Sequence, residues 1–80
     1  MNQDLETQAA HFDAIATELE QALSHARIAA RHLRDGEVPR GCAHAFALEG
    51  HLLQARQSLD AAARLHARKA RPTPMGGQLV

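Results

Sequence analysis

Histidine is the residue type in this sequence with the widest range of possible chemistry, and its spacing is regular. His11, His25 and His32 are separated by multiples of seven residues, and His44 and His51 are again seven apart. Side chains seven residues apart lie on the same side of an α-helix. Two helices packed side by side could therefore bring imidazoles face to face, an arrangement suited to binding a Zn, Ni, Cu or Fe ion.

Two other interpretations of the histidines stay open. A histidine at the edge of a helix interface can serve as an ordinary half-buried polar side chain. Alternatively, facing imidazoles could make an interface responsive to pH, because each gains a positive charge when it is protonated near about pH 6. In the metal-binding interpretation, Cys42 could add a thiolate near His44.

No set of residues predicts catalysis. None of the six histidines has a glutamate three residues before it, so the ligand pattern of di-iron helical bundles is absent. The His-Glu-x-x-His pattern of zinc proteases is absent as well. Cys42 and His44 are two residues apart and point to different sides of a helix, so they do not predict a nucleophile with its base. We expect no catalytic residues and no enzymatic activity.

The histidines fall within two long segments with helical periodicity, about residues 3–34 and 39–70. Large apolar residues and alanines recur at intervals of three, four and seven, which is typical of a helix that packs against another helix. The predicted seam contains Leu5, Phe12, Ile15, Leu19, Ala22, Ala26, Ala29 and Leu33 of the first segment, and Ala45, Leu48, Leu52, Ala55, Leu59, Ala62 and His66 of the second. A turn is predicted at residues 35–38, because Asp35-Gly36 favours a helix end and Pro39 favours a helix start.

The sequence thus predicts an all-α domain over residues 1–71, an antiparallel two-helix hairpin that pairs into a four-helix bundle. A short connection makes consecutive helices antiparallel and places residues whose numbers add up to about 76 at the same height. His25 then lies opposite His51, and His32 lies opposite His44, each beside the seam. These four histidines are the candidate metal ligands.

The predicted hairpin is short of apolar side chains for its length. Between Leu5 and Leu65 there are 14 large aliphatic or aromatic residues, spread over both segments. A core of this size is marginal for a domain of 80 residues, and oligomerisation is a usual remedy. We therefore expect a homo-oligomer, either dimer or tetramer, or a subunit of a larger complex. The expected interface residues are Phe12, Ile15, Leu19, Phe46, Leu52, Leu53 and Leu59.

Residues 72–80 form a predicted extended C-terminal tail, because two prolines and two glycines interrupt any helix there. Two interpretations stay open: a frayed terminus, or a short peptide that docks on a groove. In the second, Met75, Leu79 and Val80 are the anchors.

The charges of the chain balance, with nine basic and nine acidic residues. Arg27, Arg31, Arg34 and Arg40 make a modest basic patch near the turn, but the net charge of zero disfavours a nucleic-acid partner. The lack of a long apolar run disfavours a membrane partner, and the single cysteine suits a reducing compartment, so we expect a cytoplasmic protein. The favoured function is a non-enzymatic interaction module, and the alternative is a histidine-based metal-storage or metal-sensing bundle.

Overall fold

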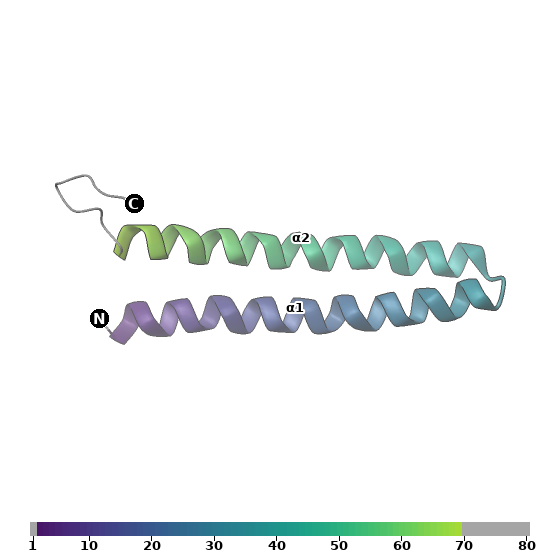
Figure 1. Ribbon diagram of the computed structural model, residues 1–80, viewed down its shortest axis with the longest axis horizontal. Helices are drawn as coiled ribbons and strands as arrows, with labels where there is room; N and C mark the ends of the chain where they lie inside the picture. The colour runs from purple at the N-terminus through teal and green to yellow at the C-terminus, as the bar shows by residue number, and fades with distance from the viewer. Residues whose placement is uncertain (1, 70–80) are drawn as a thin grey trace.

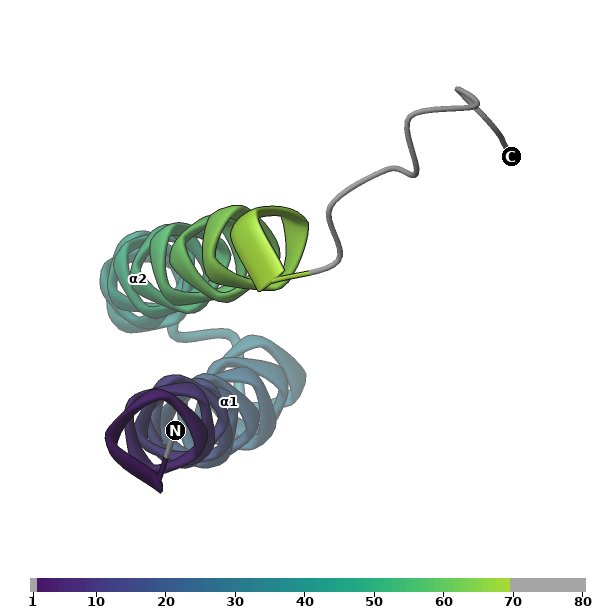
Figure 2. The same cartoon turned by 90° about the vertical axis from the view of Figure 1, so that its left-hand side faces the viewer.

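The structure is a computed structural model that describes residues 2–69. Helix α1 spans Asn2–Arg34 and helix α2 spans Val38–Lys69, and the two run antiparallel side by side (Figures 1 and 2). The predicted all-α two-helix hairpin is therefore confirmed. Within the described residues, neither helix has an apolar stretch long enough to cross a membrane. The predicted tail anchors Met75, Leu79 and Val80 lie outside the described residues.

The turn between the helices is a Schellman motif at the end of α1. Gly36 has a φ of 78°, a left-handed conformation that glycine adopts without steric cost. The N–H of Gly36 donates to the carbonyl oxygen of Leu33 at 3.0 Å, and the N–H of Glu37 donates to that of His32 at 2.8 Å. These two bonds satisfy carbonyl groups at the helix end and turn the chain back along α1.

The seam between α1 and α2 is a stripe of residues spaced alternately by four and three positions, as in a coiled coil. All of its residues are buried or half-buried, and most of them are small or polar. The stripe contains Asp4, Gln8, His11, Ile15, Glu18, Ala22, His25, Ala29 and His32 on α1, and Glu37, Gly41, His44, Leu48, His51, Ala55, Ser58, Ala62 and Leu65 on α2 and its start. Its buried apolar side chains are Ala22, Ala55, Ala62 and Leu65, so the core of the described hairpin is small.

The structure corrects the predicted position of the seam on α1. Leu5, Phe12, Leu19 and Leu33 are exposed instead of packed between the helices, and 53% of Phe12 is accessible. The stripe one residue earlier, which carries the histidines, faces α2 in their place. The prediction of Ala22 and Ala29 as seam residues agrees with their burial or half-burial.

The same correction applies to α2. Ala45, Leu52, Leu59 and His66 are exposed, although the periodicity places them in the seam. The stripe that faces α1 in their place contains His44, His51, Ser58 and Leu65. His44 and His51 make hydrogen bonds and ring contacts with side chains of α1. Because these polar side chains find their partners between the helices, Leu52 and Leu59 lie beside the contact.

Gly41 lies at a close approach of the two helices near the turn. A Cβ atom built on Gly41 would lie 2.7 Å from Cδ2 and 2.8 Å from Cγ of Leu33, and 3.5 Å from the carbonyl oxygen of Ala29. A Cβ atom built on Gly50, by contrast, meets no other atom within 4 Å. Gly41 therefore has a packing role, and Gly50 has none within the hairpin.

These two glycines predict different responses to alanine. Gly50→Ala should stabilise the protein by about 1 kcal/mol, because glycine is a poor helix former at an open position. Gly41→Ala should gain clearly less, because the new methyl group must displace Leu33. Urea unfolding followed by circular dichroism measures both changes, and equal gains would contradict the close approach at Gly41.

Candidate functional site

Four histidines and two glutamates form a continuous line of contacts along the seam, which we call the histidine ladder. Its members, in spatial order, are Glu18, His51, His25, His44, His32 and Glu37. From Glu18 to His32 the successive members alternate between α1 and α2, so the line zigzags across the contact between the helices. All six side chains are half-buried.

The centre of the ladder consists of two stacked ring pairs joined by a hydrogen bond. The rings of His25 and His51 are stacked with centroids 5.2 Å apart, and those of His32 and His44 are stacked at 5.5 Å. Nδ1 of His25 lies 2.9 Å from Nδ1 of His44. One of these two nitrogens must carry a proton and donate it, while the other accepts.

The two ends of the ladder are carboxylates. Nδ1 of His51 lies 2.7 Å from Oε1 of Glu18, and Nδ1 of His32 lies 2.6 Å from Oε1 of Glu37. An ionised carboxylate can accept but not donate, so Nδ1 of each outer histidine carries the proton. The other oxygen of Glu37, Oε2, lies 3.4 Å from Nη1 of Arg40.

The end of the ladder at Glu37 is part of the turn itself. His32 and Glu37 are the two positions of the Schellman motif whose side chains often make an apolar contact. Here they make a hydrogen bond, which ties the helix end to the ladder. The turn and the ladder therefore act together on the relative position of the two helices.

The structure brings together the histidine pairs that the register predicts, His25 with His51 and His32 with His44. It adds a diagonal contact between His25 and His44 that the prediction did not include. It also adds Glu18 and Glu37, which could have been found from their spacing. Glu18 is seven residues before His25, and Glu37 is seven before His44.

The remaining candidate ligands lie apart from the ladder. Cys42 is an exposed free cysteine, and no contact with His44 is found in the described residues. His11 is half-buried in the seam and His66 is exposed, and no ring contact joins them within residues 2–69. The ladder is thus confined to the half of the hairpin nearer the turn.

The arrangement of the ladder disfavours multidentate metal binding. Within residues 2–69, no group of three or more histidine, cysteine, aspartate or glutamate side chains is placed to hold one metal ion. The convergent pair of Nδ1 atoms on His25 and His44 offers two ligands. The rings of His51 and His32 are stacked on those of His25 and His44, so their nitrogens do not point to the same place. They therefore do not supply a third or fourth ligand to a metal ion between His25 and His44.

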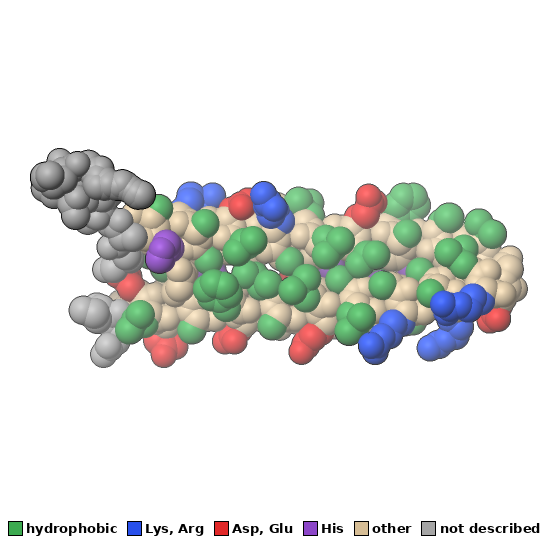
Figure 3. All heavy atoms as spheres, in the orientation of Figure 1, with side chains coloured by type: hydrophobic (Ala, Val, Ile, Leu, Met, Phe, Trp, Pro, Cys, Tyr) green, Lys and Arg blue, Asp and Glu red, His purple; other side chains and the backbone are tan. Residues whose placement is uncertain are grey.

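A second candidate site is formed by exposed hydrophobic side chains, and we call it the apolar face. Its members are spaced by seven residues or multiples of seven. Each directly follows a residue of the seam stripe that carries the ladder residues. They are Leu5, Phe12, Leu19 and Leu33 on α1, and Val38, Leu52 and Leu59 on α2, all of them exposed. In an antiparallel pair these equivalent positions lie on the same side, and Figure 3 shows hydrophobic side chains along both helices beside the line where they meet.

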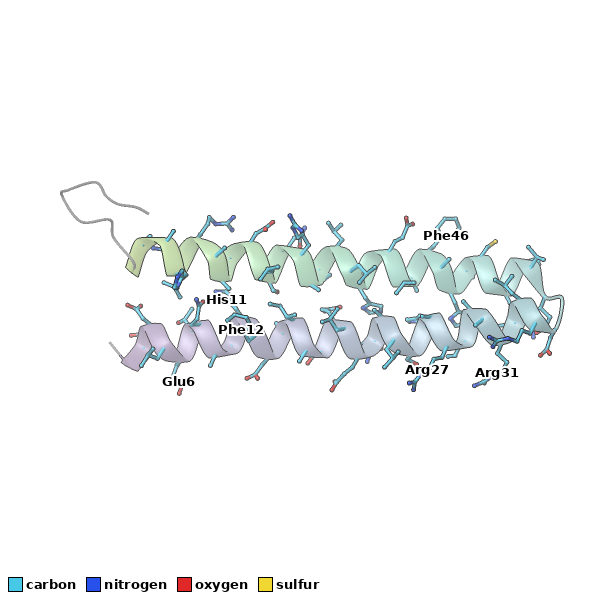
Figure 4. All side chains as sticks on the ribbon, in the orientation of Figure 1. Glu6, His11, Phe12, Arg27, Arg31 and Phe46 are labelled. Carbon is cyan, nitrogen blue, oxygen red and sulfur yellow. The ribbon has the colours of Figure 1, made fainter. Side chains whose placement is uncertain are left out.

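The other predicted interface residues lie off the apolar face. Phe46 is 72% accessible and points away from α1 on the outer side of α2 (Figure 4). Leu53 lies seven residues further along α2 on the same stripe and is also exposed. Ile15 is half-buried in the seam. The predicted interface residues are therefore divided among three surfaces of the hairpin.

Comparison of the chain with protein-family models, curated proteins and solved structures finds no match.

The hydrogen bond between His25 and His44 should contribute to the stability of the hairpin. A hydrogen bond of this kind contributes about 1 kcal/mol. We therefore expect a His25→Gln/His44→Gln variant, which also loses the stacked rings, to be less stable than the unaltered protein by about that amount.

The hydrogen bonds at the two ends of the ladder are made to carboxylates, which are stronger acceptors than neutral amides. A Glu18→Gln/Glu37→Gln variant should therefore also be less stable than the unaltered protein. Thermal unfolding measures both changes, and unaltered stability in both double variants would show that the ladder does not stabilise the hairpin.

Proposed function

We propose that this chain is a non-enzymatic helical interaction module that buries its apolar face against another helical surface. It acts in the cytoplasm as a self-associating scaffold or as a small subunit of a larger complex. The observation that carries the proposal is the division of the apolar residues, because the buried core consists of three alanines and Leu65 while the large side chains of the apolar face stay exposed.

The exposed side chains of the apolar face are large aliphatic and aromatic ones, which stabilise a helical protein when they are buried. Leu19, Leu52 and Leu59 are each 46% accessible in the hairpin, although their periodicity is that of a helix interface. Burying a leucine side chain contributes roughly 1.5–3 kcal/mol. A contiguous exposed patch of this kind is typical of a surface that contacts another protein.

The size of the apolar face is sufficient for a stable complex. The helices contain 33 and 32 residues, so each is roughly 50 Å long and 10 Å wide. One face of the hairpin then measures roughly 1,000 Å², and a stable interface buries about 800 Å² on each partner. The face is therefore large enough for a stable contact with one partner.

The alternative function, a histidine-based metal-storage or metal-sensing bundle, is supported by the convergent Nδ1 atoms of His25 and His44. A Zn or Cu ion between them would replace the shared proton. The need for further ligands, which the described residues do not supply at that point, makes this the weaker of the two proposals. A stoichiometric metal in the native mass spectrum of untagged protein, lost in the His25→Gln/His44→Gln variant, would favour it.

The interaction proposal is tested by a matched pair of double variants. Leu19→Asp/Leu59→Asp places charges on the apolar face, whereas Thr17→Asp/Gln57→Asp places them at exposed positions two residues earlier on the opposite side of each helix. We expect the first variant to lower the thermal midpoint by roughly 10 °C or more, because it removes buried leucines from an interface. The second should change it little.

Native mass spectrometry and thermal unfolding of the same samples give the outcome. An oligomer that is lost in the first variant supports the proposal, as does a marginally folded monomer, whose apolar face then needs a different protein. A fully stable monomer whose midpoint is equal in both variants would overturn it.

A further inference from the structure

We infer that the apolar face is covered by a second copy of this chain, related by a two-fold axis that lays the turn of one hairpin over the open end of the other. The inference rests on the proposed function and names its partner. In this arrangement α1 packs antiparallel on α1 of the second copy, and α2 packs antiparallel on α2.

The charges along the outer edge of α1 support this arrangement. One stripe of residues seven positions apart reads Glu6, Asp13, Glu20, Arg27 and Arg34, so it is acidic toward the open end and basic toward the turn. All five side chains are exposed, and Figure 3 shows the same separation of acidic and basic groups along α1.

The charge stripe lies on the flank of the apolar face. Each of its first three residues directly follows Leu5, Phe12 or Leu19 in the sequence. The charge stripe therefore lies next to the apolar stripe around α1, on the side away from α2. Figure 4 shows Glu6 and Arg27 pointing away from α2. When two apolar faces meet, flanking positions of this kind come within reach of their equivalents in the partner helix.

The two-fold axis makes the stripe complementary to itself. With the axis between Glu20 and Arg27, Glu20 of each copy meets Arg27 of the other, and Asp13 of each copy meets Arg34 of the other. Four ion pairs then border the contact between the two α1 helices. None of these four residues takes part in an ion pair within the described hairpin.

The other two-fold arrangement, with both open ends on the same side, fits the charges less well. It stacks α1 on α2 of the second copy, with Asp13 at the height of Asp60 and Arg27 at the height of Phe46. The carboxylates of Asp13 and Asp60 would then meet, and Arg27 would face Phe46 instead of an acidic residue. Complementarity therefore selects the arrangement with the turn over the open end.

Charge reversal followed by mixing tests the inference on the full chain. Glu20→Arg and Arg27→Glu should each weaken the homodimer about tenfold, because each replaces two attractions by two repulsions. A mixture of the two variants should form a heterodimer, in which an arginine pair on one chain meets a glutamate pair on the other. The Glu20→Arg/Arg27→Glu double variant should regain the affinity of the unaltered dimer. Arg64→Glu, an exposed reversal away from the apolar face, is the control for charge alone.

Native mass spectrometry of the mixture counts the homodimers and heterodimers, and circular dichroism verifies that every variant is helical. Preferential heterodimers support the inference. Dimers that form equally well in all variants and in random proportion would overturn the arrangement while leaving the proposed function intact. A marginally folded monomer would overturn the second copy as the partner, whereas a fully stable monomer would overturn the proposed function as well.

Discussion

The hydrogen bond between Nδ1 of His25 and Nδ1 of His44, 2.9 Å long, lies at the centre of the contacts that hold the two helices in register. Stacked rings extend it in both directions, and Glu18 and Glu37 end the line with carboxylates. A polar group in a helix seam favours one register because any slip of the helices leaves it without its partner. The ladder contributes specificity in this way, and it places few apolar atoms between the helices.

The rest of the architecture follows from which stripe of each helix occupies that seam. Gly41 lets the helices approach near the turn, and the turn at Gly36 starts α2 close to the end of α1. Because the histidines and glutamates occupy much of the contact, leucines such as Leu19, Leu52 and Leu59 lie beside it as the apolar face, while Leu65 is buried. A hairpin whose core is mostly alanine is marginal by itself, so most of its potential hydrophobic stabilisation is available for assembly.

The sequence predicted the hairpin and the pairing of His25 with His51 and His32 with His44, because the turn signal and the seven-residue spacing determine them. It placed one stripe of the seam on each helix correctly, including Ala22 and Ala55, and misplaced the other stripe by one position. Choosing this stripe by hydrophobicity fails for a physical reason, because an exposed apolar stripe has the same period along a helix as a stripe buried within the hairpin. Hydrophobicity alone therefore selects large side chains such as Leu19 over the polar stripe beside them. The predicted tail anchors lie outside the described residues, so their role stays a prediction.

The packing of α1 against α2 is tested most directly by nuclear Overhauser contacts between histidine ring protons. Mixing isotope-labelled and unlabelled chains separates contacts within one chain from contacts between two chains. We predict ring contacts within one chain that join His51 to His25, His25 to His44 and His44 to His32. A helical chain without these contacts, with Leu19 packed between its own two helices instead, would contradict the seam on which the apolar face and its proposed assembly depend.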